Sequence, residues 1–85
     1  MTETLEFPAE FPIKVMGRQD SDLKALTRGI IERHTGPLEE QRMKERPSGD
    51  GNFLALTYTV TAHSREQLDA IYRELTACKA VLMAL

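Results

Sequence analysis

The sequence has little of what several classes of protein require. Its 85 residues include one cysteine, no tryptophan, two tyrosines and three phenylalanines. A single cysteine cannot form an intrachain disulfide and leaves no Cys-x-x-Cys pair for a metal. No stretch approaches the roughly 18 apolar residues of a membrane-spanning helix, and the acidic start lacks the apolar core of a secretory signal. We therefore expect a protein of the reducing cytoplasm with no membrane partner.

The sequence also lacks a large excess of charge of either sign. Eleven Lys and Arg residues against thirteen Asp and Glu residues give a net charge of −2, which supplies no overall attraction for nucleic acid or anionic lipid. A chain of this length forms one small domain and buries only about 60–65% of its unfolded surface. Such a domain has little room for both a core and a deep catalytic pocket, so we expect no enzyme and no cofactor.

The start of the chain predicts an extended leader and a strand. Residues 1–10 combine acids with apolar residues, among which Leu5 and Phe7 can anchor the leader to the domain. Apolar and other residues then alternate over residues 11–16, the period of a half-buried strand. A single domain is expected to occupy residues 11–85.

A helix is expected next. Asp20 or Ser21 suits its N-cap, and Gly36-Pro37 ends it, since glycine accepts a left-handed conformation and proline cannot continue a helix. Gly29 costs roughly 1 kcal/mol in a helix interior and is expected to mark close packing on the sheet. The apolar stripe is expected at Leu23, Leu26, Ile30 and Ile31.

The second half of the chain predicts a hairpin, a helix and a last strand. Within residues 38–47, the alternation over 41–46 favours a polar edge strand. Residues 48–52 are a dense turn signal, and residues 53–62 predict the clearest strand. The segment 64–67 matches a capping box, in which Ser caps the helix and Gln reaches back. Residues 81–85 are apolar on both faces and form a final strand.

These elements follow the order β-α-β-β-α-β. Two right-handed crossovers around a central hairpin give a four-stranded antiparallel sheet with both helices on one face. The fold class is therefore α+β, the ferredoxin-like two-layer sandwich, with strand order 4-1-3-2. The charged second strand and the apolar last strand then lie at the two edges.

The turn after the first strand is the first candidate binding site. It ends a strand and opens a helix, where free N–H groups and the helix dipole can hold an anionic group. In this hypothesis Gly17 allows close approach to the backbone, Arg18 pairs with a small carboxylate metabolite, and Met16 and Asp20 complete the site. Gly17→Val should then abolish binding and leave the fold mostly intact. The structural alternative is that Gly17 only permits a positive φ and Ser21 only caps.

A basic patch is the second candidate, because RNA-recognition domains share this topology. Arg42, Lys44 and Arg46 would share one face of the second strand, and Lys14 could join them on the open sheet. Base stacking needs aromatic residues on the central strands, and Phe53 at a strand end is the one available. Nucleic acid is therefore the less favoured partner, and a charged edge that resists aggregation is the structural alternative.

Other chemistry finds little support in the sequence. His34 and His63 lie far apart and show no metal-ligand spacing. Cys78, beside Lys79, is of a kind that usually serves as a small buried hydrophobe. We therefore assign no catalytic residue and no metal ligand.

The apolar last strand would be an unprotected edge. It is either covered by the leader or paired with a second chain, and we favour cover by the leader. The sequence thus allows a monomer or a weak homodimer.

Several motifs resemble one family of small bacterial proteins of unknown function, the YbeD-like family. They are Leu5-Glu6-Phe7-Pro8, Lys14-Val15-Met16-Gly17 after Phe11, the turn over 48–52, Tyr72-x-Glu74-Leu75 and Val81-Leu82-Met83. The resemblance implies a fold similar to ACT-type regulatory domains and a regulatory or interaction role with a metabolite or a protein. Some members lie near lipoate-attachment genes, and no catalytic residue is carried over. A regulatory module is thus our first hypothesis, and RNA binding is the alternative.

Overall fold

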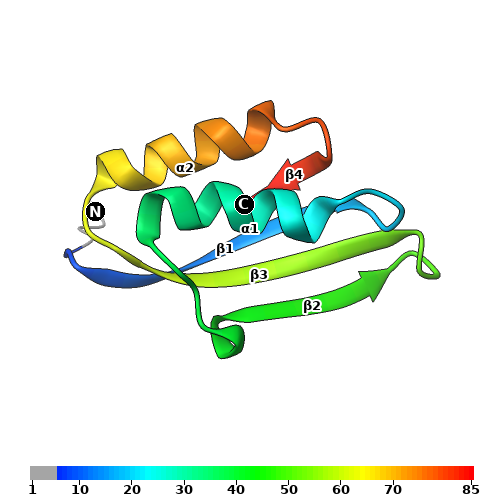
Figure 1. The fold of residues 1–85 in the computed structure, drawn as a ribbon, viewed down its shortest axis with the longest axis horizontal. Helices are drawn as coiled ribbons and strands as arrows, with labels where there is room; N and C mark the ends of the chain where they lie inside the picture. Colours follow the sequence, from blue (N-terminus) through cyan, green and yellow to red (C-terminus); the bar gives the residue numbers. More distant parts are fainter. Residues whose placement is uncertain (1–5) are drawn as a thin grey trace, which may run out of the picture.

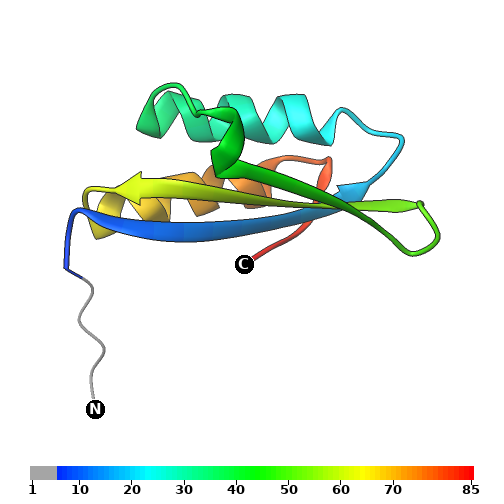
Figure 2. The same cartoon turned by 90° about the horizontal axis from the view of Figure 1, so that it is seen from below.

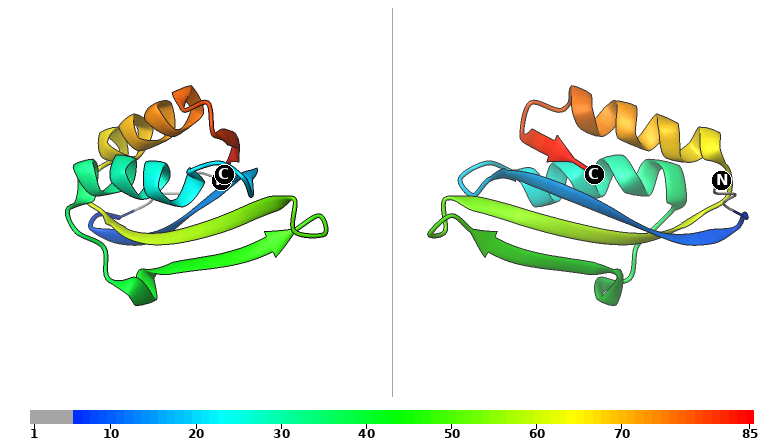
Figure 3. Two further views of the ribbon diagram at one scale, coloured as in Figure 1. Left: turned by 45° about the vertical axis from the view of Figure 1, so that its right-hand side comes forward. Right: turned by 180° about the vertical axis from the view of Figure 1, so that it is seen from behind.

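A four-stranded sheet and two helices form the two layers of residues 6–85, the part of the chain that the computed structural model describes (Figure 1). The sheet is antiparallel throughout, with strand order β2-β3-β1-β4, so the predicted ferredoxin-like arrangement is confirmed. The two views of Figure 3 show β2 and β4 at opposite edges. The elements are β1 (Ala9–Arg18), α1 (Leu23–Thr35), a short 3-10 helix (Glu40–Arg42), β2 (Met43–Ser48), β3 (Phe53–Ala62), α2 (Arg65–Ala77) and β4 (Val81–Ala84).

The first strand is longer than its alternation predicts. β1 begins at Ala9, inside the expected leader, because its ladder with β3 runs without interruption from Ala9 opposite Ala62 to the far end. Phe7 is half-buried and packs against the core, as expected of an anchor. Leu5, the second expected anchor, lies outside the described residues.

The core lies between the helices and one face of the sheet, and no helix of residues 6–85 covers the other face (Figure 2). Strict alternation along β3 puts every second side chain into this core, which confirms the predicted period. α2 contributes the expected stripe. The buried members from these two elements are Leu54, Leu56, Tyr58, Val60, Ala62, Leu68, Ile71 and Leu75.

The apolar stripe of α1 differs from the prediction at one position. Leu26 is 46% exposed, and Thr27 is fully buried in its place. The Thr27 hydroxyl lies 2.6 Å from the Tyr58 hydroxyl and donates to the Leu23 carbonyl at 2.8 Å. A buried phenol needs a hydrogen-bond partner, and burial also raises the pKa of Tyr58. The helix therefore turns a threonine inward to satisfy a tyrosine from the sheet.

Two further expectations about α1 were wrong. The N-cap is Asp22, without a side-chain cap, whereas the Ser21 hydroxyl donates to the Arg18 carbonyl at 2.7 Å and Asp20 lies in the turn. A Cβ built on Gly29 would meet nothing within 4 Å, so this glycine does not mark close packing.

The capping box of α2 is confirmed. The Ser64 side chain accepts from the Gln67 backbone N–H at 3.0 Å, and the Gln67 side-chain oxygen accepts from the His63 N–H at 2.6 Å. The amide nitrogen of Gln67 donates to the His34 carbonyl at 2.8 Å. One side chain thus caps α2 and fastens it to the end of α1.

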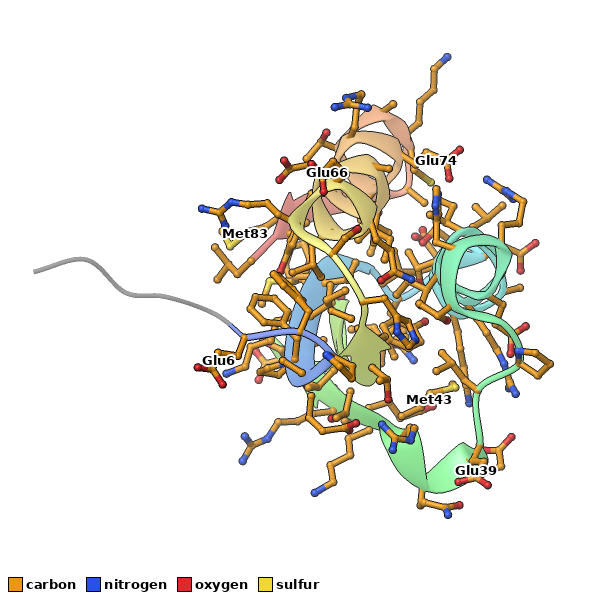
Figure 4. The ribbon with its side chains drawn as sticks, turned by 90° about the vertical axis from the view of Figure 1, so that its left-hand side faces the viewer. Glu6, Glu39, Met43, Glu66, Glu74 and Met83 are labelled. Carbon is orange, nitrogen blue, oxygen red and sulfur yellow. The ribbon has the colours of Figure 1, made fainter. Side chains whose placement is uncertain are left out.

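Glu74 makes the second link between the helices, on the side of α2 that faces α1 (Figure 4). One of its carboxylate oxygens lies 3.0 Å from both the Arg33 guanidinium and the His34 ring. The hydrogen bond from His34, with Arg33 close by, lowers the pKa of Glu74.

No helix within residues 6–85 is long and apolar enough to cross a bilayer.

Candidate functional site on the open face of the sheet

On the uncovered face of the sheet, side chains form two neighbouring rows that run across the strands from the β4 side to β2. The strand register sets Lys14 opposite Thr57 and Thr57 opposite Lys44, with Leu85 hydrogen-bonded to Lys14 on the other side. The next row runs Met83, Met16, Ala55 and Arg46. Both rows therefore end in an apolar side chain on the β4 side and a cation on β2.

Side-chain size makes a hollow between these row ends. Ala55 and Thr57 on the central strand β3 are short, whereas long side chains flank them on both sides. The result is an open hollow of about 470 Å³. Neighbouring strands are about 4.8 Å apart, so the Lys14 and Lys44 backbones lie about 10 Å apart across β3. Such a hollow is wide enough for an extended chain or a small ligand. We call its open-face lining residues, Lys14, Met16, Lys44, Arg46, Ala55, Thr57, Met83 and Leu85, the open-face site.

The cations of this site are not neutralised from within the described part of the chain. Lys14, Lys44 and Arg46 are exposed and take part in no ion pair among residues 6–85. Glu45, which lies between two of them in sequence, faces the other way because strand neighbours alternate. It pairs with Lys24 of α1 at 2.8 Å. Three unpaired cations beside apolar side chains favour an anionic partner with apolar groups.

Arg42, the fourth predicted basic residue, does not join this site. It belongs to the 3-10 helix before β2, and its guanidinium pairs with Glu10 at 2.6 Å and donates to the Thr59 carbonyl at 3.2 Å. Thr61 donates to the other Glu10 oxygen at 2.7 Å, and these hydrogen bonds lower the pKa of Glu10. The charge of Arg42 is thus already balanced.

The four residues predicted around the first turn are divided by the structure. Met16 lies on the open face, Arg18 is the exposed last residue of β1, opposite Phe53, and Asp20 is exposed in the turn that follows, with its carboxylate 3.6 Å from the Arg18 guanidinium. Gly17 is buried. A metabolite site made by all four residues stays a prediction.

Gly17 has a packing role that its sequence context does not reveal. A Cβ there would overlap the Ala80 carbonyl oxygen and lie 2.7 Å from Leu23. Its φ is not positive, so close approach of the chain, and not backbone freedom, requires a glycine. The expectation that Gly17→Val would leave the fold intact is therefore wrong.

Aromatic platforms and metal ligands are not assembled on the described residues. The outward residues of β3 between its ends are alanine and threonines, and Phe53 sits at the hairpin end of the strand. Within residues 6–85, no three His, Cys, Asp or Glu side chains are grouped as ligands of a metal would be. Cys78 is free and half-buried.

The sequence did not identify the apolar half of the open-face site. Met83 and Leu85 join it only through the pairing of the last strand with β1, which brings together residues about 70 positions apart. The signal that could have found them is the alternation in the last strand, which places Met83 and Leu85 on one face.

The sequence of the chain matches a family profile and several known proteins. A family profile described as "Protein of unknown function (DUF493)" matches residues 2–85. A UPF0250 protein of Ralstonia nicotianae is 44% identical over 81 residues, which cover 95% of this chain and 84% of that protein. A UPF0250 protein of a Janthinobacterium strain is 46% identical over 77 residues, covering 89% and 85%. A UPF0250 protein of Chromobacterium violaceum is 42% identical over 83 residues, covering 98% and 93%.

Proposed function

The chain belongs to the DUF493 family of YbeD-like proteins, whose function is unknown, and we propose from the geometry of its sheet that it is a non-enzymatic interaction module. Its working surface is the open-face site, and its partner is an acidic segment of another protein that carries apolar side chains. The observation that supports this most is the pair of rows that end in Lys44 and Arg46 on one side and Met83 and Leu85 on the other.

The partner chemistry follows from the composition of the site. Lysine and arginine with no internal partner attract carboxylates from a distance, and the attraction weakens with salt. Methionine adapts its shape to different apolar groups, and Met16 and Met83 face each other across the β1–β4 pair. On the described residues, a nucleic acid would find the cations of the open face but no row of aromatic side chains on which to stack its bases.

The shape of the site favours an extended segment over a compact metabolite. The hollow is open along the sheet, and ligand pockets for small molecules usually enclose most of the ligand surface. A segment lying across the rows can place carboxylates over β2 and apolar side chains over β4. It would bind with the weak affinity of a small, partly polar interface.

The proposal is tested by titrating the ¹⁵N-labelled protein with a synthetic peptide that alternates Asp with Leu. We expect amide shifts that cluster at Lys14, Lys44, Arg46 and Ala55 and that shrink as salt is raised. Comparison probes are the same peptide with Lys for Asp, a single-stranded oligouridylate, and a pool of amino acids and small carboxylates. Binding of any comparison probe in preference to the acidic peptide contradicts the proposal, as do shifts confined to residues 17–22.

A charge-reversal pair gives the matched control. Lys44→Glu with Arg46→Glu should abolish peptide binding, whereas Arg65→Glu with Arg73→Glu makes the same change of net charge on α2, on the other layer. The α2 variant should bind at least about ten times more tightly than the β2 variant at low salt. Equal loss in both variants would mean that only overall charge matters, and the open-face site would not be the binding surface.

A further inference from the structure

The edge of the sheet formed by β4 differs from every other exposed part of the described chain in being apolar and able to pair. Leu82, Met83 and Leu85 are 57%, 51% and 68% exposed. Among residues 6–85, β1 is the one strand that pairs with β4, so the other side of β4 is open. We propose that this edge binds a second copy of the same chain, with the two β4 strands antiparallel across a two-fold axis.

The hydrogen-bond pattern fixes which backbone groups are available. Lys14 and Leu85 exchange both of their backbone hydrogen bonds, at 3.0 and 2.7 Å. Because bonded and non-bonded pairs alternate in an antiparallel ladder, the N–H and C=O of Ala84 point away from β1, toward the open edge. Two copies can therefore exchange both bonds between Ala84 and Ala84 of the second copy.

This register makes the side chains self-complementary. With Ala84 opposite itself, Met83 of each copy lies opposite Leu85 of the other, and both pairs are apolar. On the side of the sheet that faces the core, Ala84 lies opposite Ala84 of the second copy. These small side chains leave room for the helical layers of the two copies to lie next to each other. Each dimer thus covers two methionines and two leucines that a single copy leaves in water.

The other edge explains why pairing stops at two copies. β2 carries Lys44, Glu45, Arg46 and Pro47 in succession, and charges and proline are what protect an edge from adding strands. Each copy then has one open edge, and a two-fold contact between two open edges leaves none.

Charge around the β4 edge is compatible with a second copy, unlike charge on the open face. The Tyr72 hydroxyl donates to the Leu85 carbonyl at 2.8 Å, so the stripe of α2 that contains Tyr72 faces β4. That stripe holds Arg65 and Asp69 at helical spacing, one cation and one anion. The open face carries three unpaired cations and would repel its own copy.

The dimer depends on the hydrogen-bonding edge of β4, whereas the proposed function depends on the hollow, and the two surfaces share Met83 and Leu85. The contact is small, since β4 has four residues, so the dimer is weak and depends on concentration. The dimer brings the two open-face sites side by side on one eight-stranded sheet.

Sedimentation velocity of the full chain from about 10 μM to about 1 mM tests the inference, the range of weak association. We expect the weight-average mass to rise from 9.6 kDa toward twice that value. Ala84→Pro should weaken the dimer at least about tenfold, because proline removes the donor at the edge while the bonds to β1 do not involve that N–H. Retained amide dispersion shows that the variant still folds.

A charge swap tests the register. Met83→Glu and Leu85→Lys should each weaken the dimer, and the double variant should restore it, because each Glu then lies opposite a Lys of the second copy. A chain that stays monomeric over the whole range overturns the inference, and so does a dimer that Ala84→Pro leaves unchanged. Dimerisation seen only after removal of residues 1–5 also overturns it, since the leader would then cover the edge.

Discussion

The two faces of the sheet are built from the same strands and serve different ends. On β3, Leu56 and Tyr58 are buried under the helices, and Ala55 and Thr57 form the floor of the open hollow. Alternation alone separates them. One face therefore carries the packing that stabilises the fold, and the other can vary its chemistry at little cost in stability.

The two faces should therefore respond differently to substitution. Changes on the covered face should alter the free energy of unfolding, and changes on the open face should alter binding.

Gly17→Val should have the largest effect on stability. Its side chain would have to displace the Ala80 backbone and Leu23, and overpacking of this kind costs about 3 kcal/mol. That is a large part of the stability expected for so small a domain. Urea unfolding measures it, and a variant as stable as the wild type would contradict the close approach of β1 and the chain before β4.

Thr27→Val should cost about 1–3 kcal/mol, because the buried Tyr58 hydroxyl would lose its 2.6 Å contact with Thr27 and keep the much longer bond to the Lys24 carbonyl, at 3.4 Å. Thr57→Val is the matched control on the open face of β3, where the hydroxyl is not needed by the core. It should change stability by less than about 0.5 kcal/mol. Urea unfolding measures both changes. Similar losses of stability in both variants would contradict the different roles of the two faces.

Gly29→Ala should stabilise the protein by about 1 kcal/mol, since alanine is the better helix former and its Cβ meets nothing within 4 Å. The thermal midpoint should rise by several degrees. A fall in the midpoint would show that another group packs on this part of α1.

Acid should destabilise the fold through its carboxylates. The pKa values of Glu10, Glu32 and Glu74 are lowered in the folded protein by hydrogen bonds, from Arg42, from the Leu38 N–H and from His34 respectively. A lowered folded-state pKa gives stability that is present above the unfolded-state value and is lost as pH falls through the folded one. Urea unfolding between about pH 5 and pH 2 should show this loss.

Two controls identify the groups responsible. Glu74→Gln should flatten the dependence of the unfolding free energy on pH, because the variant lacks the carboxylate whose protonation weakens the contacts with Arg33 and His34. High salt should also flatten it in part, because solvent reaches the ion pairs of Glu10 and Glu74 and salt screens them. If neither the substitution nor salt changes the pH dependence, groups other than these carboxylates cause the loss of stability in acid.

Local patterns in the sequence were sufficient for the order of elements, the buried face of β3 and the Ser64 cap. They could not place Thr27 in the core, because its partner Tyr58 is 31 residues away. Nor could they show that Glu10 neutralises Arg42, since a contact over 32 positions has no local signal. The cationic half of the open-face site was visible as alternation in one strand, whereas its apolar half depended on how β4 pairs with β1.

The separation of the two faces can be tested on one variant, Lys44→Glu with Arg46→Glu. Its free energy of unfolding and its affinity for the acidic Asp-Leu peptide are measured side by side with those of the wild type. The separation of the two faces predicts a change in stability within about 0.5 kcal/mol together with loss of peptide binding. Unchanged peptide binding, or loss of binding that comes only with unfolding, would contradict it.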